Sequence, residues 1–244
     1  MSLVAFIRGL CTMIVAVPLT FVISALTLID LHWGRKSEVK VQLFPRYWGR
    51  ILCRIAGVRV RVEGLDQLDA NKTYIFAGNH CSQYDILAFQ GYFSHDFRWI
   101  AKKELFRIPL FGPAMHRAGY IPIDRSHGRQ ALKSLDEAAQ RIASGSSVLI
   151  FPEGTRSSDG VLQEFKAGAV LLAIKAGVEI VPLGINGSHK VLAKGAFLPH
   201  PGEIVLRIGA PMPTHHFRSS DKQQLAAELH RAVADLLDAG QRPQ

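Results

Sequence analysis

The sequence predicts an α/β fold in which a mostly parallel or mixed sheet is flanked by helices and preceded by N-terminal membrane-associated helices. Two observations support this prediction. From residue 57 onward, strand-like runs alternate with helix-like runs, which is typical of a sheet covered on both faces. Before that point lie a long uncharged segment and a basic amphipathic segment. We therefore divide the chain into an anchor with an interfacial helix, residues 1–56, and one globular domain, residues 57–240.

Seven strands and five helices are expected in the globular domain. The strands are predicted at 58–62, 73–77, 98–101, 119–123, 147–151, 179–185 and 203–208. The helices are predicted at 83–93, 109–117, 128–144, 167–176 and 220–240, where apolar residues recur at helical spacing. Residues 241–244 are expected to fray. In such folds the chemistry lies on loops at strand ends.

The composition narrows the range of functions. Hydrophobic residues make up 48% and charged residues 20%, which excludes a disordered or fibrous chain. The net charge of +9 suits an anionic partner, whether nucleic acid, an acidic membrane face or a phosphorylated substrate. Cys11, Cys53 and Cys81 are odd in number and show no C-x-x-C spacing, so neither a disulfide framework nor a zinc knuckle is expected.

The uncharged run Gly9–Ile29 is long enough to cross a hydrocarbon core of about 30 Å as a helix. A cleaved signal peptide has a shorter apolar region after a basic start, and here only Arg8 precedes the run, so a retained anchor is favoured. Pro18 permits a kink, which leaves a hairpin within one leaflet as an alternative. Basic residues follow the run and place the globular domain in the cytoplasm, at the inner membrane: Arg35, Lys36, Lys40 and Arg46.

A second membrane signal follows directly. One face of the predicted helix is apolar and carries Phe44, Trp48, Ile51, Leu52 and Ile55. The opposite face carries Arg46, Arg50 and Arg54. Such a helix suits the lipid interface, and the alternative is a surface helix packed on its own domain with solvated arginines. Beside the anchor, the interfacial interpretation is favoured.

The segment Asn79–Asp85 follows a strand and opens a helix. A histidine is a general base near neutral pH, and it works better when a carboxylate holds one ring nitrogen. His80 and Asp85 are five residues apart and would not be neighbours on one continuous helix. They can meet only if His80 precedes the helix and Asp85 lies in its first turn. As alternatives, Asp85 is a capping-box partner of Ser82, and His80 is an ordinary loop histidine.

The segment Phe151–Ser157 follows the strongest strand. Glu153 and Arg156 lie on a loop with Gly154 and Thr155, where backbone N–H groups can turn toward an anion. A guanidinium binds phosphate through two parallel hydrogen bonds. The alternative is a surface turn with an ordinary Glu–Arg pair.

Basic residues also follow two other predicted strands. Lys102 and Lys103 end one strand, and Arg125 ends the segment Gly119–Arg125. Together with Arg156 they are candidates for one phosphate site, or else they are solvated charges.

Taken together, these segments resemble the lysophosphatidic acid acyltransferase family, the 1-acyl-sn-glycerol-3-phosphate acyltransferases of the glycerolipid acyltransferase superfamily. Asn79–Asp85 matches the family's NHxxxxD block and Phe151–Ser157 its FPEGTRS block. Gly119–Arg125 and Val181-Pro182-Leu183 match the second and fourth blocks, and Lys102 lies in a segment similar to the family's K-[KR]-E-L. Four blocks in the family's order are far more specific than any one of them.

The resemblance implies that residues 57–240 are a catalytic acyltransferase domain. It implies acyl transfer from acyl-CoA or acyl-carrier protein to the sn-2 hydroxyl of 1-acyl-sn-glycerol-3-phosphate, with no cofactor, no metal and no covalent acyl-enzyme. His80 would be the general base and Asp85 its orienting carboxylate, with backbone N–H groups at the start of the next helix as candidate oxyanion donors. Substrate binding falls to Lys102, Arg125, Glu153, Gly154, Thr155 and Arg156.

Two alternatives remain open. One is a different lysolipid acceptor, either another lysophospholipid or a lyso-aminolipid. The other is a non-catalytic membrane lipid-binding protein, which predicts a broken His–Asp pair, whereas both residues are present. A nucleic acid is not expected as a partner, because no known motif or aromatic–basic platform is found.

Overall fold

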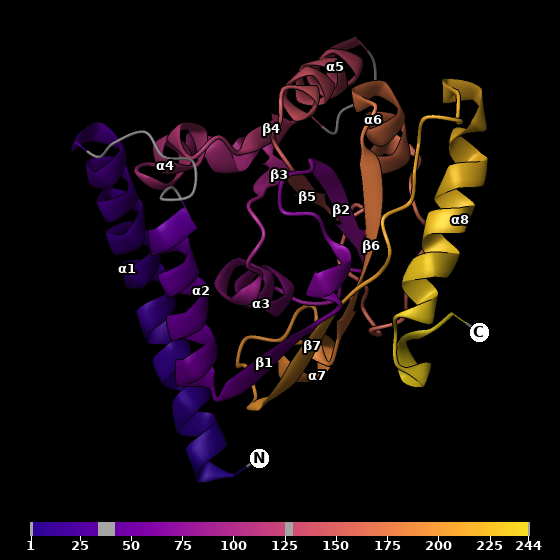
Figure 1. The fold of residues 1–244 in the computed structure, drawn as a ribbon. Helices are drawn as coiled ribbons and strands as arrows, with labels where there is room; N and C mark the ends of the chain where they lie inside the picture. Colours follow the sequence, from indigo (N-terminus) through magenta and orange to yellow (C-terminus); the bar gives the residue numbers. More distant parts are fainter. Residues whose placement is uncertain (1, 34–41, 125–128, 244) are drawn as a thin grey trace.

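The computed structural model describes residues 2–33, 42–124 and 129–243, and within it seven strands form one mixed sheet (Figure 1). The strands are β1 Val58–Glu63, β2 Tyr74–Gly78, β3 Arg98–Lys102, β4 Ile121–Ile123, β5 Val148–Ile150, β6 Glu179–Asn186 and β7 Gly202–Ile208. Their order is β1-β7-β6-β2-β5-β3-β4, in which β6 and β7 pair antiparallel and the other neighbours pair parallel. The predicted fold class is confirmed.

Helices cover both faces of the sheet (Figure 1). α3, Tyr84–Tyr92, lies on one face, and α5, Arg129–Ala143, α6, Gly168–Ala176, and α8, Lys222–Asp235, lie on the other. Successive residues of β2 point to opposite faces, so Tyr74 and Phe76 enter one apolar core while Ile75 and Ala77 enter the other. The central strand is therefore buried on both sides.

The predicted elements correspond closely to those observed. Every predicted strand is found within about two residues of its expected ends. The short helices α4, Phe111–Arg117, and α7, Ser188–Val191, and the 3₁₀ turns Leu65–Gln67, Lys103–Arg107, Ser219–Asp221 and Ala239–Gln241 complete the described chain. The last predicted helix was too long, because α8 ends at Asp235 and the chain turns back toward the sheet.

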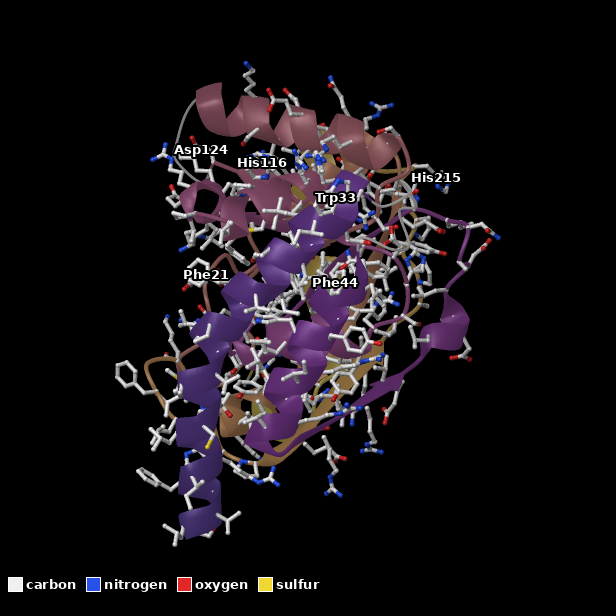
Figure 2. The ribbon with its side chains drawn as sticks, turned by 90° about the vertical axis from the view of Figure 1, so that its left-hand side faces the viewer. Phe21, Trp33, Phe44, His116, Asp124 and His215 are labelled. Carbon is white, nitrogen blue, oxygen red and sulfur yellow. The ribbon has the colours of Figure 1, made fainter. Side chains whose placement is uncertain are left out.

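The predicted anchor is part of α1, a continuous helix over Leu3–Trp33, and this is the one helix in the described chain that is long and apolar enough to cross a membrane. Its inward side carries small and polar residues, namely Gly9, Thr12, Ser24 and Thr27. Its outward side exposes large apolar residues, among them Phe21 and Trp33 (Figure 2). The full set is Leu3, Val4, Phe6, Ile7, Leu10, Met13, Ile14, Val17, Phe21, Val22, Leu26, Ile29 and Trp33. This polarity is the reverse of that of a water-facing helix.

α2, Leu43–Ala56, packs between α1 and α3. On the α1 side, the indole Nε1 of Trp48 donates a hydrogen bond to Thr20 Oγ1 at 3.0 Å. On the α3 side the backbones approach closely, because a Cβ on Gly49 would lie only 2.5 Å from the carbonyl oxygen of Leu87. The structure therefore packs α2 on its own domain, and its place at the lipid interface stays a prediction.

The arginines of α2 are bonded rather than merely solvated. Arg50 Nε donates to the carbonyl of Gly91 at 2.7 Å, and Arg46 Nη2 donates to that of Ser94 at 2.9 Å. These carbonyls lie at the end of α3 and just beyond it, where helical backbone acceptors lack partners within the helix. The two arginines thus fix α2 against the domain that carries His80. Arg35, Lys36 and Lys40 lie outside the described residues.

Candidate active site

The two best candidate segments meet at one edge of the sheet. β2 pairs parallel with β5 and with β6, so the loops that follow these three strands leave from the same edge. The loop after β2 carries His80, and the loop after β5 carries Phe151–Arg156. Ser157 N donates to the carbonyl of His80 at 2.7 Å, which joins the two loops directly.

His80 and Asp85 form the pair that the sequence predicts. His80 Nδ1 lies 2.8 Å from Asp85 Oδ2, with His80 before α3 and Asp85 in its first turn. Because the carboxylate accepts from Nδ1, we assign the proton to Nδ1 and leave Nε2 with the lone pair. The side chain of His80 is 14% exposed and that of Asp85 is 0% exposed, so only the imidazole can be reached from outside.

Asp85 also supports the start of the helix. Its Oδ2 accepts from the backbone N–H groups of Cys81 and Ser82, each at 2.8 Å. The capping contact between Ser82 and Asp85 is thus present, and the catalytic role of Asp85 stays a prediction. These contacts engage the N–H groups of Cys81 and Ser82, so the expected oxyanion donors stay a prediction for the other N–H groups near the start of the helix.

Two residues of the β5 loop hold His80 from the other side. The ring of Phe151 stacks on the imidazole with centroids 4.0 Å apart and planes 6° apart. Glu153 Oε1 accepts from the backbone N–H of His80 at 2.8 Å. Glu153 is only 3% exposed, and burial raises its pKa to about 8. Its carboxyl group therefore faces the catalytic loop, and no ion pair between Glu153 and Arg156 is found in the described residues.

The residues on either side of His80 are buried. Asn79 donates through Nδ2 to the carbonyl of Ile185 at 2.9 Å and accepts from Ile185 N at 2.7 Å, which joins the ends of β2 and β6. The Cys81 thiol is fully buried, and that burial raises its pKa far above the ordinary value. A thiolate nucleophile at Cys81 is therefore strongly disfavoured.

Three cations lie around the turn after β5, and one of them is a predicted phosphate ligand. Arg156 lies half-buried at the end of the turn, and the exposed Lys194, which sequence reasoning did not single out, donates through Nζ to the Arg156 carbonyl at 2.8 Å. Lys166 lies over Gly154, since a Cβ there would be 3.1 Å from its Nζ. Across the described residues, no carboxylate lies within ion-pair distance of these three cations.

Of the other predicted ligands, one lies further along the sheet and one lies on the turn itself. Lys102 is exposed at the carboxyl end of β3, two strands away from β2, and Lys103 is paired with Asp124. Thr155 is exposed on the turn. Arg125 lies outside the described residues. In the part of the chain that the structure describes, no group of three or more His, Cys, Asp or Glu side chains is arranged to hold a metal ion.

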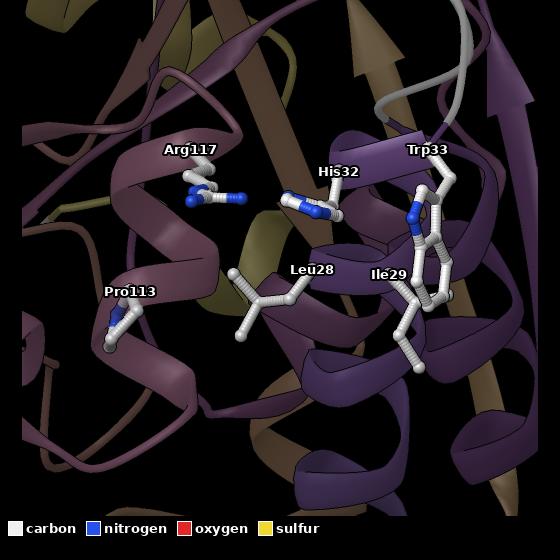
Figure 3. Close-up of a pocket in the computed structure, with 6 residues that line it drawn as sticks. All are labelled: Leu28, Ile29, His32, Trp33, Pro113 and Arg117. Atoms are coloured by element: carbon white, nitrogen blue, oxygen red, sulfur yellow. The ribbon is translucent and has the colours of Figure 1, made fainter.

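One cavity lies elsewhere, between α1 and α4, with a volume of about 420 Å³. Figure 3 shows Arg117 and Pro113 of α4 on one side and Leu28, Ile29, His32 and Trp33 of α1 on the other. Neither His80 nor Asp85 lines this cavity, so it is separate from the His–Asp pair.

Comparisons with known proteins show the family of this chain. Residues 59–186 match the sequence model of the family described as Acyltransferase. The chain is 31% identical over 225 residues to a 1-acyl-sn-glycerol-3-phosphate acyltransferase of Cocos nucifera, a match that covers 92% of this chain and 72% of that one. It is 32% identical over 181 residues to the enzyme of that name in Pseudomonas aeruginosa, covering 74% and 68%. The chain belongs to the lysophosphatidic acid acyltransferase family.

A solved structure extends the likeness to the whole fold. The crystal structure of the 1-acyl-sn-glycerophosphate (LPA) acyltransferase PlsC from Thermotoga maritima matches this acyltransferase with a TM-score of 0.78 at 25% identity, over 95% of this chain and 97% of that one. The match includes the N-terminal helices, because it covers nearly every residue. The family resemblance and the enzyme class inferred from the sequence are thus confirmed.

Proposed function

We propose that this acyltransferase moves a fatty acyl group from acyl-CoA or acyl-carrier protein to the sn-2 hydroxyl of 1-acyl-sn-glycerol-3-phosphate, which gives phosphatidic acid. The observation that carries the proposal is the His80–Asp85 pair, buried on the carboxylate side and open on the imidazole side. The names of the relatives support the choice of acceptor.

The reaction follows from the assigned proton positions. His80 Nε2 takes the proton of the acceptor hydroxyl as that oxygen attacks the thioester carbonyl. The imidazolium that forms is stabilised by Asp85 through Nδ1. When the tetrahedral intermediate collapses, the C–S bond breaks and the imidazolium returns the proton to the leaving thiolate. No covalent acyl-enzyme, metal or cofactor is required.

The acceptor phosphate is best placed at the turn after β5. Arg156 supplies a fork of N–H donors, and Lys194 and Lys166 add positive charge beside the same turn. Lys102 and Arg125 are further candidates from the neighbouring strand ends. We assign Glu153, with Gly154 and Thr155, to shaping this turn, because its carboxyl oxygen is used by the His80 backbone.

We further propose that α1 lies in one leaflet of the inner membrane, with the catalytic domain in the cytoplasm. The inward side of α1 is covered along much of its length. Arg8 donates to the carbonyl of Arg54, Thr20 bonds with Trp48, and α4 packs near the other end. A spanning helix would carry these contacts into the hydrocarbon together with Arg8 and the arginines of α2, and charged side chains are costly there. With α1 in one leaflet, its exposed apolar side is buried in lipid, and its inward side keeps its contacts with α2 and α4.

An acceptor panel tests the proposed function. Purified protein in vesicles would be given one acyl donor and a set of lysolipids that differ only in the head group, with products identified by mass spectrometry. Lysophosphatidate should be acylated at the highest kcat/KM, because its phosphomonoester carries the most accessible charge for Arg156 and its neighbours. Equal use of lysophosphatidylcholine, or a preference for a lyso-aminolipid, would contradict the assigned acceptor.

A further inference from the structure

The segment after α8 returns to the catalytic edge of the sheet through Gln241. Its side-chain Oε1 accepts from Gly187 N at 3.0 Å, and its Nε2 donates to the Ile185 carbonyl at 3.2 Å. Its main-chain carbonyl accepts from Leu162 N at 3.0 Å. One residue therefore joins the end of β6 to the segment that continues from the Phe151–Ser157 loop.

The same amide lies beside one chain neighbour of His80 and shares an acceptor with the other. The Ile185 carbonyl that accepts from Gln241 also accepts from Asn79 at 2.9 Å, and a carbonyl oxygen has two lone pairs for two such donors. Gln241 Nε2 also lies 3.9 Å from Cys81 Sγ. Asn79 and Cys81 precede and follow His80, so the backbone that presents the imidazole is fixed to a buried polar cluster that Gln241 completes.

Glutamine suits this position because one side chain must offer both an acceptor and a donor. Gly187 presents an N–H group and Ile185 a carbonyl oxygen, and Ile185 is fully buried. We propose that Gln241 is a positioning residue for acyl transfer, which holds the 79–81 backbone so that His80 meets the substrate hydroxyl in the productive orientation. Gln241 touches neither substrate phosphate ligands nor the reacting atoms. This inference rests on the proposed function, since its readout is acyl transfer.

The test is Gln241→Met, which keeps the length of the side chain and removes both hydrogen-bonding groups. A matched control is Gln224→Met, because Gln224 is exposed on α8 and its side chain bonds only to Glu228 among the described residues. Each protein would be assayed with both substrates varied, well below its melting temperature. For Gln241→Met we expect kcat to fall about tenfold, because a small misplacement of a reacting group is costly, with both KM values within about twofold of wild type.

The outcomes separate a positioning role from a structural one. If Gln241→Met melts at a lower temperature than wild type but retains its kcat, Gln241 only stabilises the fold and the inference is wrong. If the methionine variant does not fold, Gln241→Glu replaces it, since the carboxylate keeps the acceptor for Gly187 and loses the donor to Ile185. A lowered kcat in that variant supports the inference, and an unchanged kcat overturns it. Absence of acyl transfer in wild type would instead defeat the proposed function.

Discussion

Replacement of Asp85 by asparagine separates the charge of the carboxylate from its hydrogen bonds. Asp85 Oδ2 accepts from His80 Nδ1, Cys81 N and Ser82 N, each at 2.8 Å. An asparagine can place its carbonyl oxygen at the position of Oδ2 and keep an acceptor there, while its amide nitrogen takes the position of Oδ1, which has no hydrogen-bond partner among the described residues. The negative charge beside the imidazolium is then lost while the acceptor is kept.

The expected loss of rate follows from the distance between the carboxylate charge of Asp85 and the imidazolium charge of His80. Opposite charges about 4 Å apart attract by about 4 kcal/mol at the effective dielectric constant of a site near the surface, which corresponds to about a thousandfold in rate. Asp85→Asn should therefore lower kcat about a thousandfold. Asp85→Ala should do the same and should also destabilise the fold, because the N–H groups of Cys81 and Ser82 lose their acceptor at about 1–3 kcal/mol each.

The assay compares acyl transfer and thermal unfolding for wild type and both variants in the same vesicles. Both variants should turn over about a thousandfold more slowly than wild type, and the alanine variant should melt clearly below the asparagine variant. If Asp85→Asn retains more than about a tenth of wild-type kcat, the carboxylate does not stabilise an imidazolium, and the mechanism proposed here is wrong.

Three further predictions follow from the same site and from α1. Because burial raises the pKa of Glu153 from 4.5 to about 8, the folded protein keeps a proton that the unfolded chain releases between these values, so unfolding free energy should fall as the pH rises through this range. Glu153→Gln should remove that part of the slope in melts taken across the range, and an identical slope in both proteins would contradict the assignment. Arg156→Lys should raise KM for the lysophospholipid by about ten- to a hundredfold and KM for the donor far less; the reverse pattern would place donor phosphates at Arg156. Leu10→Glu with Ile14→Glu, on the exposed side of α1, should release the protein from membranes, and sedimentation after a high-salt wash checks this.

Much of this architecture could be predicted because it depends on local patterns. The strands are short runs of β-branched and aromatic residues between turn signals, and each was found where expected. The contact between His80 and Asp85 could also be predicted, because residues five apart can meet here only if the helix begins between them. The order of the strands in the sheet depends on contacts distant in the sequence, and no local pattern predicts it.

The features that escaped sequence reasoning depend on such distant contacts. Gln241 was expected to fray, yet its partners Leu162, Ile185 and Gly187 lie more than fifty residues earlier in the chain. Arg50 reads as one charge of an amphipathic face, and only the packing of α2 on α3 reveals the carbonyl that it binds. The sequence does not show which buried acceptor a charged or amide side chain will bind.

The measurement that tests the central claim most directly is acyl transfer by His80→Ala, shown to be folded and membrane-bound, from a labelled thioester to lysophosphatidate. Turnover should be nearly abolished, and adding Asp85→Ala to it should make little further difference, because the two residues act as one unit. Substantial transfer by His80→Ala would show that this imidazole is not the base, and the account of the active site would fail.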